Sequence, residues 1–210
     1  MRILVLGATG GVGKEVVQQA LDQGHELTVL VRTPEKLRVS HPKLRCVQGD
    51  VLDPEAVDDA IQGTDAVIST LGVPPGQPSN GLIKRSIPII VEAMERYRVQ
   101  RLIFTSGIVV KTSRLSFLLR IIMRLMIRIQ LFDQVIDKKS GEEYLHKSNV
   151  NWTLLYPSIL TDGPLTRRYR FGESIKLSGV PKVSRADVAD LILKLIPDKQ
   201  SIHRELFVSY

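Results

Sequence analysis

Gly7-Ala-Thr-Gly10-Gly-Val-Gly13 follows directly after the apolar run Ile3-Leu-Val-Leu6 and opens a helix-period stretch over residues 12–23. The run is typical of a buried strand, and the glycines are spaced G-x-x-G-x-x-G. Such a loop turns sharply, brings backbone N–H groups close to a pyrophosphate and offers the anion a helix N-terminus. Because a strand precedes the loop and a helix follows it, the stretch predicts a dinucleotide-binding βαβ unit rather than an ordinary strand-to-helix turn.

Short β-branched runs alternate with helix-period stretches over roughly the first 156 residues, which indicates a parallel sheet with helices on both faces. We therefore expect a doubly wound, Rossmann-like α/β fold. The expected strands are residues 3–6, 26–31, 44–48, 66–69, 101–105, 152–156 and a last one near 205–208. The expected helices are residues 12–23, 54–61, a stretch within 80–97, 133–147 and about 185–195. Pro88 lies inside the third of these, so that helix is expected to kink or begin near it.

The length of 210 residues favours one domain, and we expect residues 1–210 to form a single NAD(P)-binding unit. Its substrate-side elements are expected mainly in the Gly- and Pro-punctuated residues 157–183, as a small C-terminal lobe on the same sheet. Apolar residues at 43% and charged residues at 24% exclude disordered, collagen-like and low-complexity classes. Since Cys46 is alone and the N-terminal apolar run is too short for a signal peptide, the expected compartment is the reducing cytoplasm.

The net charge is +7, and residues 98–139 hold the whole excess, with nine Lys and Arg residues against two Asp residues. A nucleic-acid-binding domain usually spreads its basic residues over a face with aromatics or a reading helix, so no nucleic acid partner is predicted.

Within this segment, residues 115–132 are mostly apolar but include Arg120, Arg124 and Arg128 at a spacing of four, and they mark an expected insertion at about 114–131. Three arginines oppose a membrane span. The pattern favours an inserted amphipathic helix that covers the site as a lid, forms a dimer contact, or contacts a membrane surface or a protein partner. The chain is expected to be a monomer or a homodimer.

Leu30-Val-Arg32-Thr33 ends the second expected strand, at the position that selects between the nicotinamide cofactors. An acid there hydrogen-bonds the ribose 2′-OH, whereas an Arg accommodates the 2′-phosphate. Arg32 therefore favours NADP(H) over NAD(H), unless it is only a solvated strand-end residue. After the third strand, Asp50 is placed to accept from the adenine amine and Val51 to pack on the ring, or else Asp50 caps the following helix.

The chain resembles the atypical short-chain dehydrogenase/reductases, in the NAD(P)H-binding, NmrA-like branch that includes biliverdin reductase B (flavin reductase). The resemblance covers nearly the whole chain. The motifs that carry it are Gly7-Ala-Thr-Gly10-Gly-Val-Gly13, Leu30-Val-Arg32, Gly49-Asp-Val-Leu-Asp53, Asp65-Ala-Val-Ile-Ser-Thr-Leu-Gly72, Phe104-Thr-Ser-Gly107, Asn151-Trp-Thr-Leu-Leu-Tyr-Pro157 and Ser184-Arg-Ala-Asp-Val-Ala189.

Together with the preceding patterns, the resemblance implies a cofactor site in which residues 70–72 follow the cofactor's middle. Ser106 would lie near the nicotinamide, and Pro157 and Ser158 would close over it. The candidate cofactor-binding residues are Gly7, Thr9, Gly10, Gly11, Val12, Gly13, Arg32, Asp50, Val51, Thr70, Leu71, Gly72, Ser106, Lys138, Tyr156, Pro157 and Ser158.

The candidate catalytic residues are Ser106 and Lys138, and they depart from the superfamily's Tyr-x-x-x-Lys pair. That pair works because the lysine ammonium lowers the tyrosine pKa. By the resemblance, Lys138 takes the lysine's place, and Gln134, which cannot be an acid, stands where the tyrosine belongs. Lys138 then binds the ribose or is merely solvated, since only one of Lys138 and Lys139 can face the cleft. Ser106 orients an acceptor or only caps the strand end.

The missing tyrosine weakens the case for alcohol or ketone chemistry. Hydride transfer to a conjugated acceptor needs chiefly alignment over C4 of the nicotinamide, with protons from solvent. We therefore expect an NADP(H)-dependent reductase of a flat conjugated or hydrophobic small molecule, such as a flavin or a quinone. Ile159 stands where the flavin reductase branch has a His, so a flavin or tetrapyrrole specificity does not follow. The alternative is a non-catalytic NAD(P)(H)-binding protein of the NmrA-like type, used in redox sensing or assembly.

Two further groups of polar residues carry less information. Arg167-Arg-Tyr-Arg170 either meets an anionic substrate or is a solvated charge run. No metal site is predicted, because the histidines have no Cys or carboxylate at ligand spacing. They are His25, His41, His146 and His203.

Overall fold

The computed structural model describes residues 1–74, 76–107, 132–175, 177 and 180–210. The amphipathic helix expected at 114–131 lies outside these residues. The strands are β1 (Arg2–Leu6), β2 (Glu26–Val31), β3 (Leu44–Gln48), β4 (Ala66–Ser69), β5 (Arg101–Thr105), β6 (Asn151–Pro157), β7 (Ile159–Thr161), β8 (Arg170–Gly172), β9 (Lys182–Ser184) and β10 (Arg204–Ser209). The helices are α1 (Gly11–Asp22), α2 (Pro54–Ile61), α3 (Leu82–Arg96), α5 (Phe132–Lys147) and α6 (Arg185–Leu195), with short 3₁₀ turns at Pro34–Lys36 and Lys199–Ser201.

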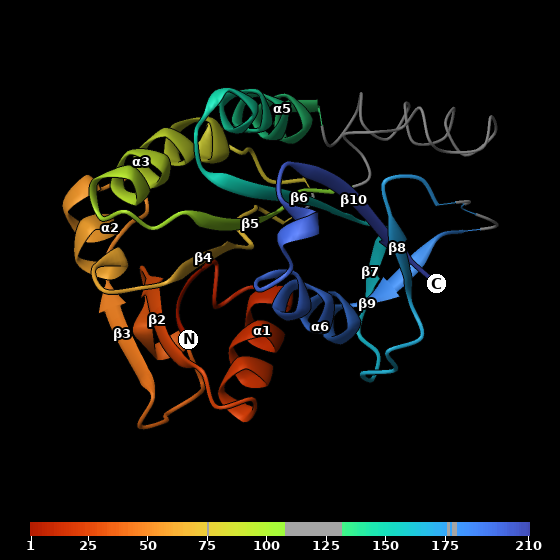
Figure 1. Cartoon of the computed structure of the whole chain (residues 1–210), viewed down its shortest axis with the longest axis horizontal. Coiled ribbons are helices and arrows are strands. Elements are labelled where there is room, and N and C mark those ends of the chain that lie inside the picture. Colours follow the sequence, from red (N-terminus) through yellow and green to blue (C-terminus); the bar gives the residue numbers. More distant parts are fainter. Residues whose placement is uncertain (75, 108–131, 176, 178–179) are drawn as a thin grey trace.

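Eight strands form one sheet in the order β3-β2-β1-β4-β5-β6-β10-β8, and all neighbours are parallel except β10 and β8. Helices α2, α3 and α5 cover one face, and α1 and α6 cover the other (Figure 1). The doubly wound fold expected from the sequence is confirmed. The strand order reverses between β1 and β4, and in such sheets ligands bind at the carboxyl ends of the strands that flank this point.

Strand β1 shows why the expected strands read as continuous apolar runs. Leu4 and Leu6 point into the core beneath α2, α3 and α5, while Ile3 and Val5 point into the core beneath α1 and α6. All four side chains are fully buried. A strand covered on both faces has no solvent side, so its sequence shows no alternation of polar and apolar residues.

Helix α3 begins at Leu82 and runs through Pro88 to Arg96, so the expectation that it could begin near the proline is wrong. Its first residue follows Gly81, which has φ +69° and supplies no side-chain cap. The cap comes from α5, where the buried Asp137 carboxylate accepts from the backbone N–H groups of Ile83 (3.0 Å) and Lys84 (2.8 Å). A tertiary contact therefore sets the start of this helix.

The C-terminal quarter packs on the same sheet, as expected. Strand β10 pairs in parallel with β6, and β8 pairs with β10 in the antiparallel direction. Strands β7 and β9 form a separate parallel pair, and neither they nor β8 were among the expected strands. Within the described part of the chain, no helix has both the length and the apolar character needed to cross a membrane.

Arg101, at the start of β5, joins α6 to the sheet. Its guanidinium is buried and donates to the carbonyls of Leu195 (2.6 Å) and Ile196 (3.1 Å) at the end of α6. It also donates to the Asn151 carbonyl (2.8 Å) and the Ser201 hydroxyl (2.7 Å). Burial lowers the pKa of Arg101 to about 10, and Asp198 opposes that shift. The side chain is therefore still a cation at neutral pH, and it satisfies carbonyls that no helical N–H can reach.

We expect Arg101→Met to lower the free energy of unfolding by ~3 kcal/mol, because it leaves buried carbonyls without a donor. Urea unfolding at neutral pH measures the loss. The control is Arg45→Met, whose side chain forms an exposed ion pair with Asp59 and should cost less than ~1 kcal/mol. Equal losses in the two variants would contradict this role for Arg101.

Candidate functional site

A cavity of ≈ 180 Å³ opens at the carboxyl ends of β1 to β4, where the strand order reverses. It is lined by residues 7–10, 30–32, 49–51, 70–72 and Leu82. Nine of the candidate cofactor residues therefore share one cavity, namely Gly7, Thr9, Gly10, Arg32, Asp50, Val51, Thr70, Leu71 and Gly72. They come from four strand ends that lie far apart in the sequence.

The glycine-rich turn brings α1 against the end of β1. Gly7 has φ +82°, and a Cβ on Gly13 would lie 2.1 Å from the Gly7 carbonyl oxygen. Helix α1 then starts at Gly11 with no side-chain cap and no acidic residue in its first turn. Its first N–H groups and the positive end of its dipole are left to an external anion. These residues fit the pyrophosphate of a dinucleotide.

Arg32 and Asp50 lie at the ends of β2 and β3. Arg32 is exposed and has no hydrogen-bond or ion-pair partner among the described residues. Asp50 Oδ1 accepts from the Leu52 N–H at 2.9 Å. The alternative that Asp50 caps the next helix is wrong, because the N-cap of α2 is Asp53, which accepts from the Glu55 N–H. Both Arg32 and Asp50 line the cavity.

Thr70 ties the end of β4 to the glycine-rich turn. Its hydroxyl lies 3.0 Å from the Leu6 carbonyl oxygen and 3.3 Å from that of Gly7, and it can donate its proton to one of them at a time. This contact fixes the wall of the cavity that continues through Leu71 and Gly72.

Gln134, the residue expected in the place of the superfamily's tyrosine, joins α5 to the segment after β4. Its Nε2 amide donates to the carbonyls of Pro74 and Gln77, both at 2.9 Å. The neighbouring Asp133 accepts from the Ser79 N–H at 2.5 Å. These bonds hold the segment after β4 against α5, and they occupy both amide protons of Gln134.

Lys138 lines a second, very small cavity of ≈ 10 Å³, which shares Gly72 and Leu82 with the first. Its side chain is half-buried, whereas Lys139 is exposed, so Lys138 is the lysine that faces the cleft. Burial lowers the pKa of Lys138, and the carboxylates of Glu142 and Asp137 act in the opposite direction.

Ser106 is buried at the end of β5, and its hydroxyl donates to Glu142 Oε1 on α5 at 2.6 Å. This bond joins the end of β5 to α5. Tyr156 in β6 is fully buried and stacks on Phe207 with 5.2 Å between ring centroids. Burial raises the pKa of Tyr156, and the Glu142 and Glu205 carboxylates raise it further.

The remaining candidate cofactor residues do not line either cavity in the described part of the chain. Val12 and Gly13 are buried behind the glycine-rich turn. Pro157 and Ser158 are buried at the end of β6, where the Ser158 hydroxyl donates to Ser209 Oγ at 3.1 Å. Gly11 is exposed, and its neighbour is Arg185, which was not among the expected cofactor-binding residues.

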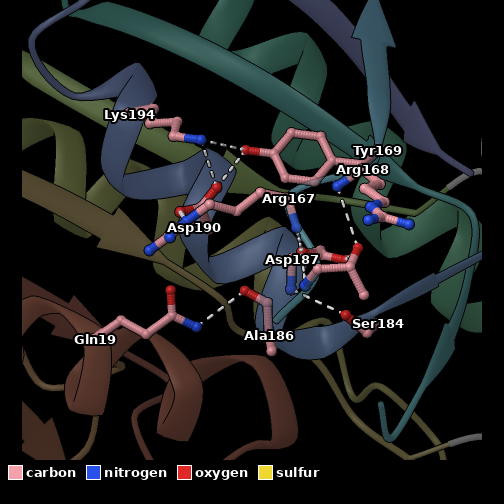
Figure 2. A network of polar contacts seen from close by, with 10 residues as sticks. Gln19, Arg167, Arg168, Tyr169, Ser184, Ala186, Asp187, Asp190 and Lys194 are labelled. Atoms are coloured by element: carbon pink, nitrogen blue, oxygen red, sulfur yellow. Dashed lines mark hydrogen bonds and ion pairs between the residues drawn. The ribbon is translucent and has the colours of Figure 1, made fainter. Parts of the chain in front are cut away.

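The run Arg167–Arg170 is held against α6 by two buried carboxylates, as Figure 2 shows for the labelled residues. Asp187 accepts from the hydroxyl of Thr166 and the backbone N–H groups of Thr166 and Arg167. Asp190 accepts from Arg167 Nε (3.1 Å), the Tyr169 hydroxyl (2.5 Å) and Lys194 Nζ (2.7 Å). Arg167, Arg168 and Arg170 are nevertheless exposed, as a solvated charge run would be. The bonds of Thr166, Arg167 and Tyr169 fix residues 166–169 against α6.

Comparisons with known proteins agree with this geometry. Residues 7–199 match the family described as NAD(P)H-binding. An uncharacterised chloroplastic protein of Arabidopsis thaliana is 28% identical over 179 residues, which are 79% of this chain and 61% of that protein. The photosystem II assembly factor Ycf39 of Synechocystis is 41% identical over 69 residues, 32% of this chain and 21% of that protein. The chain thus spans less than two thirds of these relatives.

Two solved structures have the same fold. A short-chain dehydrogenase/reductase from Veillonella parvula, in complex with NADP, superposes with a TM-score of 0.84 at 18% identity, over 100% of this chain and 94% of that one. ChuY, an anaerobilin reductase from Escherichia coli O157:H7, gives a TM-score of 0.78 at 20% identity, over 99% and 96% of the two chains.

We expect the Asp187 and Asp190 network to make stability fall in acid. Burial alone would raise the pKa of each carboxyl, but the hydrogen bonds from their partners and, for Asp190, the Lys194 cation lower it below 3.8. A carboxylate with a lowered pKa in the folded state contributes stability above about pH 4, and this contribution is lost as the pH falls further.

Urea unfolding between about pH 7 and pH 3 measures this dependence. Asp190→Asn should lower stability at pH 7 and flatten the decline below about pH 4, because the carboxylate that takes up a proton in acid is gone. Asp22→Asn, at an exposed carboxylate near the end of α1, is the control. An unchanged acid limb in Asp190→Asn would contradict the assignment.

Proposed function

Because the chain belongs to the NAD(P)H-binding family, we propose that it is an NADP(H)-dependent reductase of a flat conjugated or hydrophobic acceptor. The observation that carries the proposal is the cavity where the strand order reverses. There the uncapped start of α1 and the unpaired Arg32 offer two separate sites for phosphate groups. Such a pair of anion sites suits a dinucleotide with a third phosphate on the adenosine ribose.

The proposed roles follow the positions of the residues. The glycine-rich turn receives the diphosphate, with Gly7, Thr9, Gly10, Gly11, Val12 and Gly13 forming the turn. Arg32 receives the 2′-phosphate, and Asp50 and Val51 receive the adenine. Thr70, Leu71 and Gly72 follow the middle of the cofactor, and Lys138 binds the ribose next to the nicotinamide. Ser106, Tyr156, Pro157 and Ser158 are proposed to surround the nicotinamide.

The acceptor class follows from the groups that can move a proton. The reduced cofactor supplies a hydride from C4 of its nicotinamide. Gln134 has no acidic proton, and its amide is engaged with Pro74 and Gln77. Ser106 directs its proton to Glu142, so its oxygen faces any other neighbour as a hydrogen-bond acceptor. An acceptor that takes its protons from water suits this site better than a ketone that needs an acid at its oxygen.

A second candidate function is dinucleotide binding without turnover, in redox sensing or assembly. Two observations favour it. The position of the superfamily's tyrosine is filled by a residue with a structural role. The relative Ycf39, described as an assembly factor, is 41% identical over its matched segment. In this alternative, residues 114–131 are the proposed contact with a membrane surface or a partner protein.

The two candidates predict different results in one assay. We expect the purified chain to oxidise NADPH when a flavin, a quinone or a linear tetrapyrrole is supplied, and to be much slower with simple ketones. Absorbance at the NADPH band measures the rate. Tight NADPH binding without turnover on any acceptor would overturn the reductase proposal and favour the second candidate.

We expect Arg32→Ala to weaken NADPH binding by about tenfold or more and NADH binding by less than about twofold. A charge-assisted contact to the 2′-phosphate exists only with NADPH. Isothermal titration calorimetry with both cofactors measures the ratio. Arg45→Ala, which removes an exposed arginine of the adjacent strand β3, is the matched control. An equal loss for both cofactors would remove the argument for the phosphate.

A further inference from the structure

Arg185 lies on the glycine-rich turn, although 174 positions separate it from Gly11 in the sequence. A Cβ built on Gly11 would be 2.5 Å from Arg185 Nε and 2.6 Å from its Cδ. Gly11 is the first residue of α1, and Arg185 is the first residue of α6. The two helices pack side by side (Figure 1), and Gln19 of α1 donates to the Ala186 carbonyl at 2.9 Å (Figure 2). The guanidinium is therefore held across the start of α1.

The electrostatics of this position are unfavourable for a cation. The N-terminus of a helix carries a partial positive charge, and Arg185 is placed at the start of two helices at once. Helix α1 contributes no acidic residue in its first turn. Helix α6 contributes Asp187, but that carboxylate already accepts from Thr166, Arg167 and Tyr210. The local positive charge is thus left largely uncompensated by the two helices.

Among the described residues, Arg185 forms an ion pair with Asp162, with 2.5 Å between Asp162 Oδ1 and Arg185 Nη1. The Asp162 side chain is 93% exposed, whereas that of Arg185 is 29% exposed. An ion pair with one fully solvated partner contributes little to stability. Nε and Nη2 of Arg185 have no hydrogen-bond partner in the described part of the chain. The guanidinium therefore keeps free donors and a weakly held counter-ion.

We propose that Arg185 is a cofactor-binding residue that pairs with the diphosphate of the dinucleotide, and that Asp162 competes with the diphosphate for the same guanidinium. The inference rests on the proposed dinucleotide site, and it adds a charged residue from the C-terminal part of the chain. The diphosphate supplies the anion that the start of α1 lacks, and it replaces the exposed Asp162 at the guanidinium of Arg185. The planar guanidinium of Arg185 carries a fork of donors that suits paired phosphate oxygens.

The proposal separates the two arginines by what they recognise. NADPH and NADH both contain the diphosphate, whereas NADPH alone has the 2′-phosphate that Arg32 is proposed to bind. Arg185→Gln should therefore weaken both cofactors by the same factor, about tenfold for the loss of one charge-assisted contact. Arg32→Ala should affect NADPH selectively. A general loss of folding would lower the affinities for both cofactors in either variant, so it would not produce this difference.

Asp162→Asn provides the opposite test. It leaves Arg185 in place and removes its competitor, so both cofactors should bind more tightly, by about threefold on the scale of one exposed ion pair. The matched controls are Arg204→Gln and Glu173→Gln, which remove the two partners of another exposed ion pair with the same changes in net charge. Neither control should change either affinity by more than about twofold.

Isothermal titration calorimetry of wild type and variants with NADPH and NADH decides between the outcomes, with thermal unfolding to verify folding. Equal weakening in Arg185→Gln together with tighter binding in Asp162→Asn supports the proposal. If Arg185→Gln changes both affinities by less than about twofold, this inference is overturned while the proposed function stands. A loss of affinity for NADPH alone has the same consequence. If Arg185→Gln does not fold, Asp162→Asn decides alone, and unchanged affinity overturns the proposal. A wild type that binds neither cofactor overturns the proposed function and this inference together.

Discussion

The contact of Gly13 with the Gly7 carbonyl determines where α1 starts relative to β1, because any side chain at Gly13 would collide with that oxygen. The remaining site depends on this approach. It places the start of α1 beside the ends of β2, β3 and β4, which supply Arg32, Asp50 and Thr70 to the same cavity. A larger residue at position 13 would move the helix away from the strand and separate the phosphate-binding turn from the other three walls.

Helix α5 holds the segment that follows β4 through three polar side chains. Asp133, Gln134 and Asp137 all bond to the segment over residues 74–84, through the amide of Gln134 and the two carboxylates. One helix face thus caps α3 and fixes the segment that follows β4. A tyrosine at position 134 could not donate to two carbonyls at once, so these two bonds require the amide of Gln134.

The sequence was sufficient for the sheet because parallel strands buried on both faces have a distinctive composition. The runs at residues 26–31, 66–69 and 101–105 became strands with those bounds. Strands β7, β8 and β9 were not expected, since three residues are too few to show a period. The start of α3 was not predictable either, because the cap that sets it comes from Asp137, 54 positions from Ile83.

The candidate site likewise contains residues that could be predicted from the sequence and contacts that could not. Residues of the first βαβ unit could be assigned from spacing, since a glycine-rich turn and the following strand end occur at fixed positions along the chain. The bond from Ser106 to Glu142, the bond from Ser158 to Ser209 and the position of Arg185 on Gly11 join distant segments. No local sequence pattern predicts such contacts, and each of them determines the hydrogen bonds or ion pairs that the side chain can still form.

Helix α6 connects the two halves of the proposed site. Its first residue, Arg185, lies on the glycine-rich turn, while Asp187 and Asp190 hold the segment at residues 166–169. Arg101 fixes the other end of the helix to the sheet through the carbonyls of Leu195 and Ile196. Arg185, Asp187 and Asp190 lie within the first six residues of one helix, which is anchored at its C-terminus and packed along α1. The glycine-rich turn and residues 166–169 therefore both contact one element.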